Sequence, residues 1–311
     1  MHSPFSRRRF VQTCALALGG AGLAPRRLFG VEPIRRAGEP RLLLSLAAYS
    51  FRDYLQDSNH PRTGNIDPAR RIDLFQFVDF CAEHGCVGTE LTNYYFPQNL
   101  DEAYLIQLRR HCFLRGVAVS GTAVGNTFTH PSGAKREQEI AGVKKWVDHA
   151  ALLGAPHIRV FAGNAQPGQS PAEAKKLCIA ALEECGDYAG RKGIFLGLEN
   201  HGGIVAEPAE ILDIVRTVRN PWIGINLDTG NFRTEDPYRD VADCAPYAVN
   251  VQIKAEIQRK GMKKEVADLK RMVLALRAVN YQGYIALEYE ADEDPWKAVP
   301  GLLKTLQGLF A

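Results

Sequence analysis

The sequence predicts a single (β/α)8 barrel, and three observations carry the prediction. Apolar runs of strand length alternate with amphipathic runs of helix length from Arg41 to the end of the chain. The chain holds eight such strand–helix units, and their spacing of roughly 30 residues is that of a βα repeat. No G-x-G-x-x-G motif follows the first apolar run, so a dinucleotide-binding sheet loses its main support. Eight units in about 270 residues match a closed barrel better than an open sheet.

The strands are expected where short apolar runs stop at turn-forming or charged residues. An apolar run without polar alternation indicates a strand buried on both faces, as in a parallel sheet covered by helices. In chain order the expected strands cover residues 42–49, 86–92, 117–124, 157–162, 194–198, 223–228, 247–254 and 284–288.

The helices are expected where apolar residues recur at helical spacing between start and stop signals. Gly85 and Gly154, for example, each follow such a stretch, and glycine is a common helix stop. Ser170 and Glu173 form a capping-box pattern with a proline at the first helical position. The expected helices cover residues 68–84, 101–115, 135–153, 171–191, 208–218, 238–245, 266–279 and 296–310.

Three strands in the C-terminal half stop at an acidic residue, namely Glu199, Asp228 and Glu288. A buried carboxylate needs a partner or a metal ion, because the interior supplies no water to it. The carboxyl ends of barrel strands meet at one face, where the chemistry of this fold takes place. Any one of these acids could be a helix N-cap, but three in one half predict a single acidic site. Oxygen-rich clusters of this kind suit hard divalent ions such as Mg²⁺ or Mn²⁺.

The first 40 residues read as an export signal and a linker, so the barrel domain is expected at residues 41–311. Arg7, Arg8 and Arg9 precede a Gly- and Ala-rich apolar run at 13–24, which is too short to span a bilayer. The arginine pair resembles the twin-arginine signal, which a receptor reads and which is not an anchor. The sequence thus predicts passage through the twin-arginine translocase to the periplasm or another exported location, with no stable membrane anchor. The alternative is a basic tail.

The charge of the barrel domain weakens any nucleic-acid function. The whole chain has a formal net charge of +3. Residues 1–40 hold seven Arg and two Glu, so the remainder holds 31 basic against 33 acidic residues, a net charge of −2. A nucleic-acid-binding domain is expected to be basic. No nucleic-acid partner is predicted, and a homo-oligomeric state is left open.

Four motifs together resemble the xylose isomerase-like TIM-barrel superfamily. They are ENHGG at 199–203, LDTGNF at 227–232, QIK at 252–254 and ALEYE at 286–290, and the resemblance extends over the whole barrel domain. The superfamily includes sugar isomerases and epimerases, inosose dehydratase and endonuclease IV. The resemblance implies a barrel enzyme, and the motifs do not specify its substrate.

The resemblance also implies a metal site and two proton carriers. Glu199, Asp228, Glu288 and the position of Gln252 match the four ligands of one divalent ion, expected to be Mn²⁺ or Mg²⁺. Gln252 replaces the usual His, although its carbonyl oxygen is able to ligate a hard cation. Glu199 and Glu288 are the expected acid–base pair. Lys254 lies two residues after Gln252 and so on the same strand face, where it is expected to neutralise an enolate or phosphate oxygen.

Further residues are predicted to contact substrate, each with a structural alternative. His201 follows the fifth strand and is expected to hold a substrate hydroxyl, or else to bond its neighbours. Asn231 stands where some epimerases carry a His. Glu90 is expected to bind substrate or to cap the next loop. Arg159 is expected to face the pocket or to form an ion pair inside the barrel.

The predicted function is therefore a metal-dependent isomerase or epimerase that moves a proton of a sugar or sugar derivative through an enediolate. An inosose dehydratase-like or keto-glycoside lyase reaction on the same fold is the first alternative. An endonuclease IV-like nuclease is a second, although Gln252 and Asn231 stand where that branch would need ligands. An exported carbohydrate-binding protein without catalysis is a third.

Overall fold

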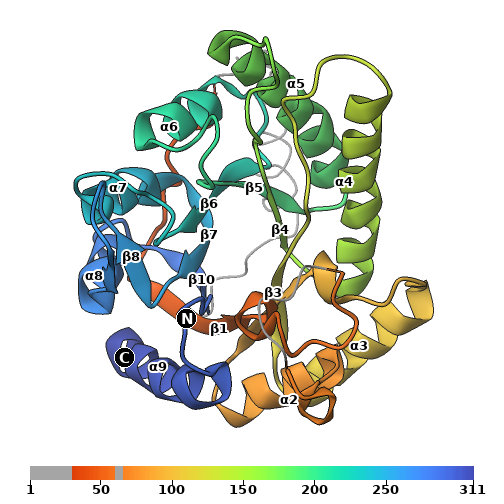
Figure 1. The fold of residues 1–311 in the computed structure, drawn as a ribbon, viewed down its shortest axis with the longest axis vertical. Coiled ribbons are helices and arrows are strands. Elements are labelled where there is room, and N and C mark those ends of the chain that lie inside the picture. The colour runs from red at the N-terminus through yellow and green to blue at the C-terminus, as the bar shows by residue number, and fades with distance from the viewer. Residues whose placement is uncertain (1–29, 60–65) are drawn as a thin grey trace, which may run out of the picture.

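Eight parallel strands close into a barrel in the computed structural model, which describes residues 30–59 and 66–311 (Figure 1). The order around the barrel is β1-β10-β7-β6-β5-β4-β3-β2. The predicted fold is thereby confirmed. The strands are β1 (Arg41–Ala47), β2 (Gly88–Thr92), β3 (Ala118–Ala123), β4 (His157–Val160), β5 (Phe195–Glu199), β6 (Ile223–Asp228), β7 (Ala248–Ile253) and β10 (Gln282–Leu287).

The helices form an outer ring around these strands (Figure 1). Their ends follow the sequence signals: Ser170 and Glu173 make a capping box, and Gly154 ends its helix with φ +77°, a conformation that favours glycine. The helices are α2 (Leu74–Glu83), α3 (Glu102–Leu114), α4 (Ala134–Leu153), α5 (Pro171–Gly190), α6 (Pro208–Thr217), α7 (Pro237–Cys244), α8 (Leu269–Ala278) and α9 (Pro295–Phe310), with 3₁₀ turns at Ala48–Phe51, Pro68–Arg70, Asn93–Tyr95 and Ala245–Tyr247.

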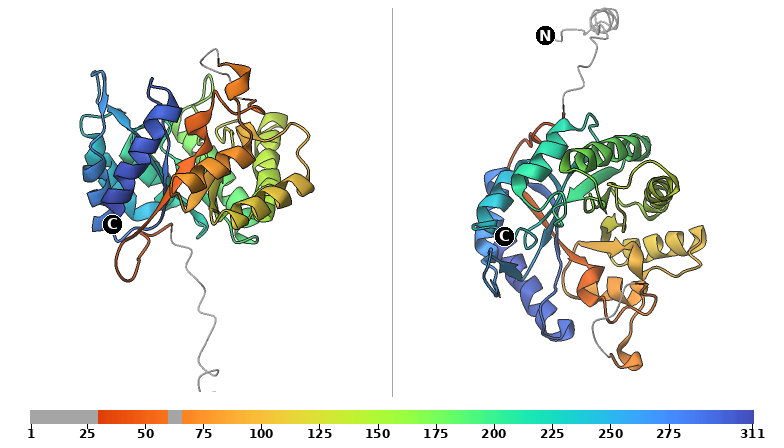
Figure 2. Two further views of the ribbon diagram at one scale, coloured as in Figure 1. Left: turned by 90° about the horizontal axis from the view of Figure 1, so that it is seen from below. Right: turned by 45° about the horizontal axis from the view of Figure 1, so that its top comes forward.

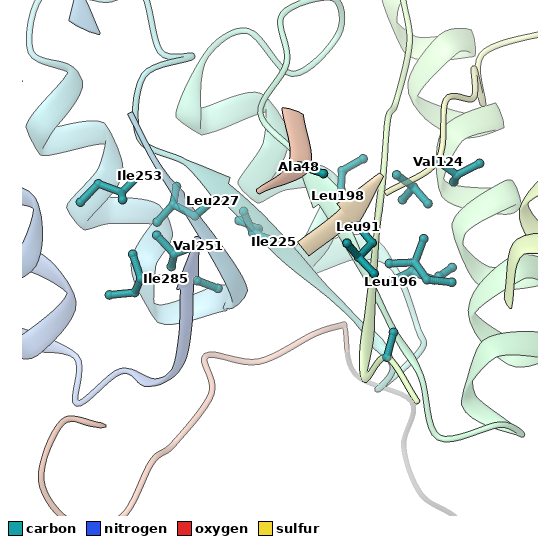
Figure 3. Close-up of a cluster of buried hydrophobic side chains, with 14 of the residues drawn as sticks. Ala48, Leu91, Val124, Leu196, Leu198, Ile225, Leu227, Val251, Ile253 and Ile285 are labelled. Atoms are coloured by element: carbon teal, nitrogen blue, oxygen red, sulfur yellow. The ribbon is translucent and has the colours of Figure 1, made fainter. Parts of the chain in front are cut away.

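The hydrophobic core lies between the strands and the helices (Figure 3). Leu196 and Leu198 of β5 and Ile225 and Leu227 of β6 are all fully buried there. Each such side chain contributes about 1.5–3 kcal/mol to stability when removed from water. Because side chains alternate along a strand, the residues between these leucines and isoleucines point into the barrel. The apolar outer face therefore fixes which residues face the interior.

The barrel interior is lined by polar and small residues. Ser45 of β1 and Ser120 of β3 share a hydrogen bond of 2.8 Å across the interior. A Cβ at Gly197 would lie 2.5 Å from His157 Nε2, and one at Gly121 would lie 2.7 Å from His157 Nδ1. These glycines leave the room that the buried imidazole occupies. The strands thus carry polar side chains inward along their length, toward the carboxyl end.

Residues 30–40 lie against the amino end of the barrel, whereas the sequence predicts a linker there. Ile34 N donates to Pro246 O at 2.8 Å, and Arg36 Nη2 donates to Ala248 O at 2.5 Å. The Arg36 guanidinium also stacks over the Tyr281 ring at 4.8 Å. The predicted signal at residues 1–29 lies outside the described residues. Across the described ranges, the helices are too short or too polar to span a membrane.

A hairpin occupies part of the segment between β7 and α8, where the sequence predicts that the helix begins at 266. Strands β8 (Glu256–Gln258) and β9 (Lys264–Val266) pair antiparallel and project beyond the carboxyl end of the barrel (Figure 2). The helix begins later because the Asp268 side chain accepts from Arg271 N and caps it there. In the same way Asp73 caps α2, which separates it from the 3₁₀ turn at Pro68–Arg70.

Candidate active site

The acidic strand ends meet at the carboxyl end of the barrel. Glu199 and Asp228 are the last residues of β5 and β6, and Glu288 directly follows β10. Strand β7 lies between β6 and β10, so Gln252 is paired with Asp228 on one side and with Ala286 on the other. This is the strand order that the sequence predicts. The four side chains are almost completely buried.

Glu199 is held by positive and neutral donors. Arg159 Nε lies 2.8 Å from Glu199 Oε2. His201 Nδ1 and Asn231 Nδ2 each donate to Glu199 Oε1 at 2.9 Å. Three residues predicted to contact substrate therefore converge on one carboxylate, and they come from β4 and from the loops after β5 and β6.

These contacts set the protonation of Glu199 and His201. Burial alone would raise the pKa of Glu199, but the Arg159 guanidinium and the hydrogen bond from His201 hold that pKa below its usual value. The hydrogen bond to Glu199 raises the pKa of His201. The His201 ring lies against the Phe161 ring, with centroids 4.6 Å apart, which fixes its orientation. Glu199 is thus an ionised carboxylate with fixed partners.

Glu288 has a different set of partners, centred on Lys254. The Lys254 ammonium lies 2.5 Å from Glu288 Oε1, 3.2 Å from Asp228 Oδ2 and 2.7 Å from Glu290 Oε2. The side chains of Lys254, Asp228 and Glu288 are at most 10% exposed, so their contacts are shielded from water, whereas the Glu290 side chain is 36% exposed. Glu288 Oε2 accepts from Gln252 Nε2 at 2.8 Å. One ammonium therefore links three carboxylates.

The acids around Lys254 are crowded, and the pKa values of the two most buried, Asp228 and Glu288, rise, whereas Lys254 holds the pKa of Glu290 below its usual value against the effect of burial. Burial raises the pKa of Asp228 to about 8 against the opposing effect of Lys254, and Glu288 adds to the rise. Burial also raises the pKa of Glu288, again against Lys254. Burial alone would lower the pKa of Lys254, but Asp228, Glu288 and Glu290 hold it well above its usual range. This half of the site therefore combines a cation with two carboxyl groups whose pKa values are raised and a third whose pKa is lowered.

A closed ring of hydrogen bonds lies below the acids. Glu90 accepts from Gln252 Nε2 at 2.6 Å and from Asn250 Nδ2 at 2.7 Å. Asn250 Nδ2 also donates to Asn226 Oδ1 at 2.8 Å, and Asn226 Nδ2 donates to Gln252 Oε1 at 2.7 Å. Burial raises the pKa of Glu90 to about 7, with Glu288 adding to it. Glu90 is fully buried in this ring, whereas the sequence predicts that it binds substrate or caps the next loop.

Sequence reasoning missed Asn226, Asn250 and Glu290. Each lies two residues from a predicted site residue on the same strand or its extension. Since side chains two apart share a strand face, this spacing was the available signal. Asn200 was also missed: its Nδ2 donates to Asp228 O at 2.8 Å, and its Oδ1 accepts from Asp228 N at 2.9 Å. Asn200 thereby holds the loops after β5 and β6 together.

The donor set does not fit the predicted four-ligand metal site in the arrangement found. In the ranges 30–59 and 66–311, no three His, Cys, Asp or Glu side chains are grouped so that they could hold a metal ion. Gln252 directs Nε2 toward the acids and Oε1 toward Asn226, which is the reverse of what a ligand requires. Asp228 Oδ2 has no hydrogen bond, and its nearby cation is Lys254. The divalent ion stays a prediction.

Two adjoining hollows open at this end of the barrel. One of about 70 Å³ is lined by Lys254 and Glu290, and one of about 290 Å³ is lined by His201. Asn231 and Arg233 line both hollows. Side chains from both halves of the site therefore reach space that a small molecule could enter. Arg233, which sequence reasoning also missed, adds a positive charge at the entrance.

Comparisons with known proteins show the family and the fold of the chain. A family model described as "Xylose isomerase-like TIM barrel" matches residues 78–306. A Xenopus laevis protein provisionally named a hydroxypyruvate isomerase is 23% identical over 188 residues, which are 56% of this chain and 68% of that protein.

Solved structures with the same fold include two epimerases. D-psicose 3-epimerase from Clostridium cellulolyticum H10 has a TM-score of 0.65 at 13% identity, covering 84% of this chain and 89% of its own. The 3-keto-D-glucoside 4-epimerase from E. coli has a TM-score of 0.63 at 16% identity, covering 86% of this chain and 100% of its own. At these identities the two likenesses support the fold alone.

Proposed function

Because the chain belongs to the xylose isomerase-like TIM barrel family, we propose that it is an isomerase or epimerase of a sugar or sugar derivative. The observation that carries the proposal is the pair of buried carboxyl groups, Glu199 and Glu288, at the mouth of the barrel. Their surroundings push their pKa values in opposite directions. Two titratable groups separated in this way are a common basis for dividing acid and base roles.

In the proposed reaction, Glu199 removes a proton from the carbon next to the substrate carbonyl. The electron pair of that C–H bond moves into the carbonyl group and gives an enediolate. In an epimerisation Glu288 returns a proton to the opposite face of the same carbon. In an isomerisation it returns the proton to the former carbonyl carbon, while the proton of the neighbouring hydroxyl passes to the former carbonyl oxygen, so that the carbonyl group forms at the neighbouring carbon. Arg159, His201 and Asn231 keep Glu199 in one orientation.

The test is solvent exchange with a panel of keto-sugars and cyclitols in D₂O, followed by NMR and mass spectrometry. We expect deuterium at one carbon and a product with the substrate's composition apart from that deuterium. A product that has lost water or an alcohol would indicate the lyase alternative instead. The double variant Glu199→Gln/Glu288→Gln is the control for background exchange. If the wild type incorporates no more deuterium than this variant into any member of the panel, the isomerase proposal is rejected for these substrate classes.

We also propose that the chain is exported through the twin-arginine route. The support is the Arg7–Arg8 pair with its following apolar run. Replacing both arginines by lysine keeps the charge, so a basic tail would behave as before. We expect the double variant to stay in the cytoplasm on cell fractionation, and unchanged export would contradict the proposal.

A further inference from the structure

We propose that Lys254, in place of a divalent ion, supplies the positive charge that stabilises the enediolate, and that Gln252 is a structural amide. The reaction is that of the proposed function, on which this inference rests. The assignment of the positive charge to Lys254 rests on the contacts of its ammonium alone. It concerns the same face of the barrel, where the sequence predicts a metal held by Glu199, Asp228, Gln252 and Glu288.

The first argument is the position of the ammonium. Lys254 Nζ lies within 3.2 Å of oxygens from Asp228, Glu288 and Glu290. Two of those acids are the predicted metal ligands on β6 and at the end of β10. A metal ion bound by them would face this ammonium at short range, and two cations at that distance repel strongly in a buried site. Lys254 would have to leave three carboxylates to admit it.

The second argument is the direction of the Gln252 amide. When Glu90 is ionised it accepts from both Gln252 and Asn250, and each of these amides then presents its nitrogen to it. Asn250 then donates its other hydrogen to Asn226 Oδ1, which leaves Asn226 Nδ2 to face Gln252 Oε1. The four hydrogen bonds that close this ring therefore fit one orientation of the three amides when Glu90 is ionised.

Turning Gln252 over would break the ring at several points. Its oxygen would face Glu90 and Glu288, which are acceptors when ionised, and its nitrogen would face the nitrogen of Asn226. A buried polar group left without a partner costs about 1–3 kcal/mol. The ring therefore opposes the reversal of the Gln252 amide, which is the change that would point its oxygen at a metal ion as the fourth ligand.

Lys254 is suited to the role that a metal would otherwise fill. An ammonium has three hydrogen-bond donors, and a substrate oxygen can take the place of Glu290, whose side chain is 36% exposed and lines the small hollow. A fixed charge in a buried site stabilises a developing oxyanion far more than it would in water. Lys254 would then hold the enediolate oxygen while Glu199 and Glu288 move the proton.

The first test measures metal binding and needs no substrate. The full chain is loaded with excess Mn²⁺, dialysed, analysed for bound metal, and titrated by calorimetry. We expect no retained Mn²⁺ in the wild type. In the double variant Lys254→Met/Gln252→His, which removes the ammonium and adds an imidazole, we expect Mn²⁺ affinity to rise by ~10-fold or more. Gln252→His alone is the matched control and is expected to gain less.

The result that would overturn the proposal is one Mn²⁺ or Mg²⁺ retained per wild-type chain and lost in Asp228→Asn. Should the double variant fold poorly by circular dichroism, the wild-type measurement still decides the question. The second test adds a chelator to the solvent-exchange assay. Exchange that survives the chelator but is lost in Lys254→Met, and partly kept in Lys254→Arg, supports Lys254. Exchange lost to the chelator and restored by Mn²⁺ overturns it and leaves the isomerase proposal intact.

Discussion

The two halves of the barrel mouth hold their carboxylates by different means. On one side, Glu199 is bound by the Arg159 guanidinium, by the His201 imidazole, whose pKa is raised, and by the neutral Asn231 amide, and in the described ranges no hydrogen bond or ion pair links it to another acid. On the other side, Glu288 shares one ammonium, that of Lys254, with Asp228 and Glu290. The same residue type is therefore kept ionised in the first half and pushed toward its protonated form in the second.

This difference shows that a strand-end carboxylate is defined by its neighbours more than by its position. Both glutamates are buried at the same end of the barrel. The first has a cation to itself, so its negative charge is balanced. Burial raises the pKa of the second, and Lys254, which it shares with two other acids, does not outweigh that effect. An acid and a base can thus be made from identical side chains, and the following predictions test that division.

The largest effect is expected from the two glutamates themselves. Glu199→Gln and Glu288→Gln each remove a proton carrier but keep the size of the side chain. Turnover should fall by ~10²–10⁴ in either variant, the usual contribution of a general acid or base. Asp228→Asn is the control, because a carboxyl group with a pKa of about 8 is already largely neutral at pH 7. If turnover falls as much in Asp228→Asn as in the other two variants, Glu199 and Glu288 are not distinguished from Asp228 as proton carriers.

The next effect concerns the pH dependence of the Glu199 half. Arg159 lowers the pKa of Glu199, so Arg159→Met should raise that pKa. Since the base must be ionised, the acid limb of the kcat/KM profile should move to higher pH, by about one unit or more. Arg233→Met removes a charge from the pocket entrance without touching Glu199, and its acid limb should stay in place. Equal shifts in the two variants would mean that Arg159 acts only through the overall charge.

A smaller effect is expected from the ring below the acids. Asn226→Leu leaves Gln252 Oε1 and one hydrogen of Asn250 without partners in a fully buried place. The free energy of unfolding should fall by about 1–3 kcal/mol, as measured by urea denaturation. Gln107→Leu changes an exposed amide on α3 and should stay within about 0.5 kcal/mol. If the two variants are equally stable, the ring does not hold Gln252 in its direction.

The smallest effect is expected from Glu290. Glu290→Gln removes one of the three carboxylates around Lys254, but that side chain is partly exposed and its ion pair is screened. We expect kcat to fall less than about fivefold, since exposed pairs contribute up to about 1 kcal/mol. If kcat falls as much as in Glu288→Gln, Glu290 takes part in the proton transfer that is proposed for Glu288.

The fold was predictable because its signals are local and repeated. Hydrophobic periodicity, helix caps such as Ser170 and stops such as Gly154 depend on a few neighbouring residues. The eight-unit period then fixed the closed barrel, and the fold placed Glu199, Asp228 and Glu288 at one end. The hairpin β8–β9 was missed because its short strands carry little apolar pattern; β9 is exposed along its length.

The sequence by itself therefore determined the barrel, its family and the acidic strand ends. Only the tertiary structure decided which partner each acid has, because residues such as Glu90 and Asn250 lie 160 positions apart in the chain. It also decided the direction of Gln252, since an amide offers a donor at one end and an acceptor at the other and takes its direction from its neighbours. A residue type specifies which contacts are available, and the closed barrel specifies which of them are made.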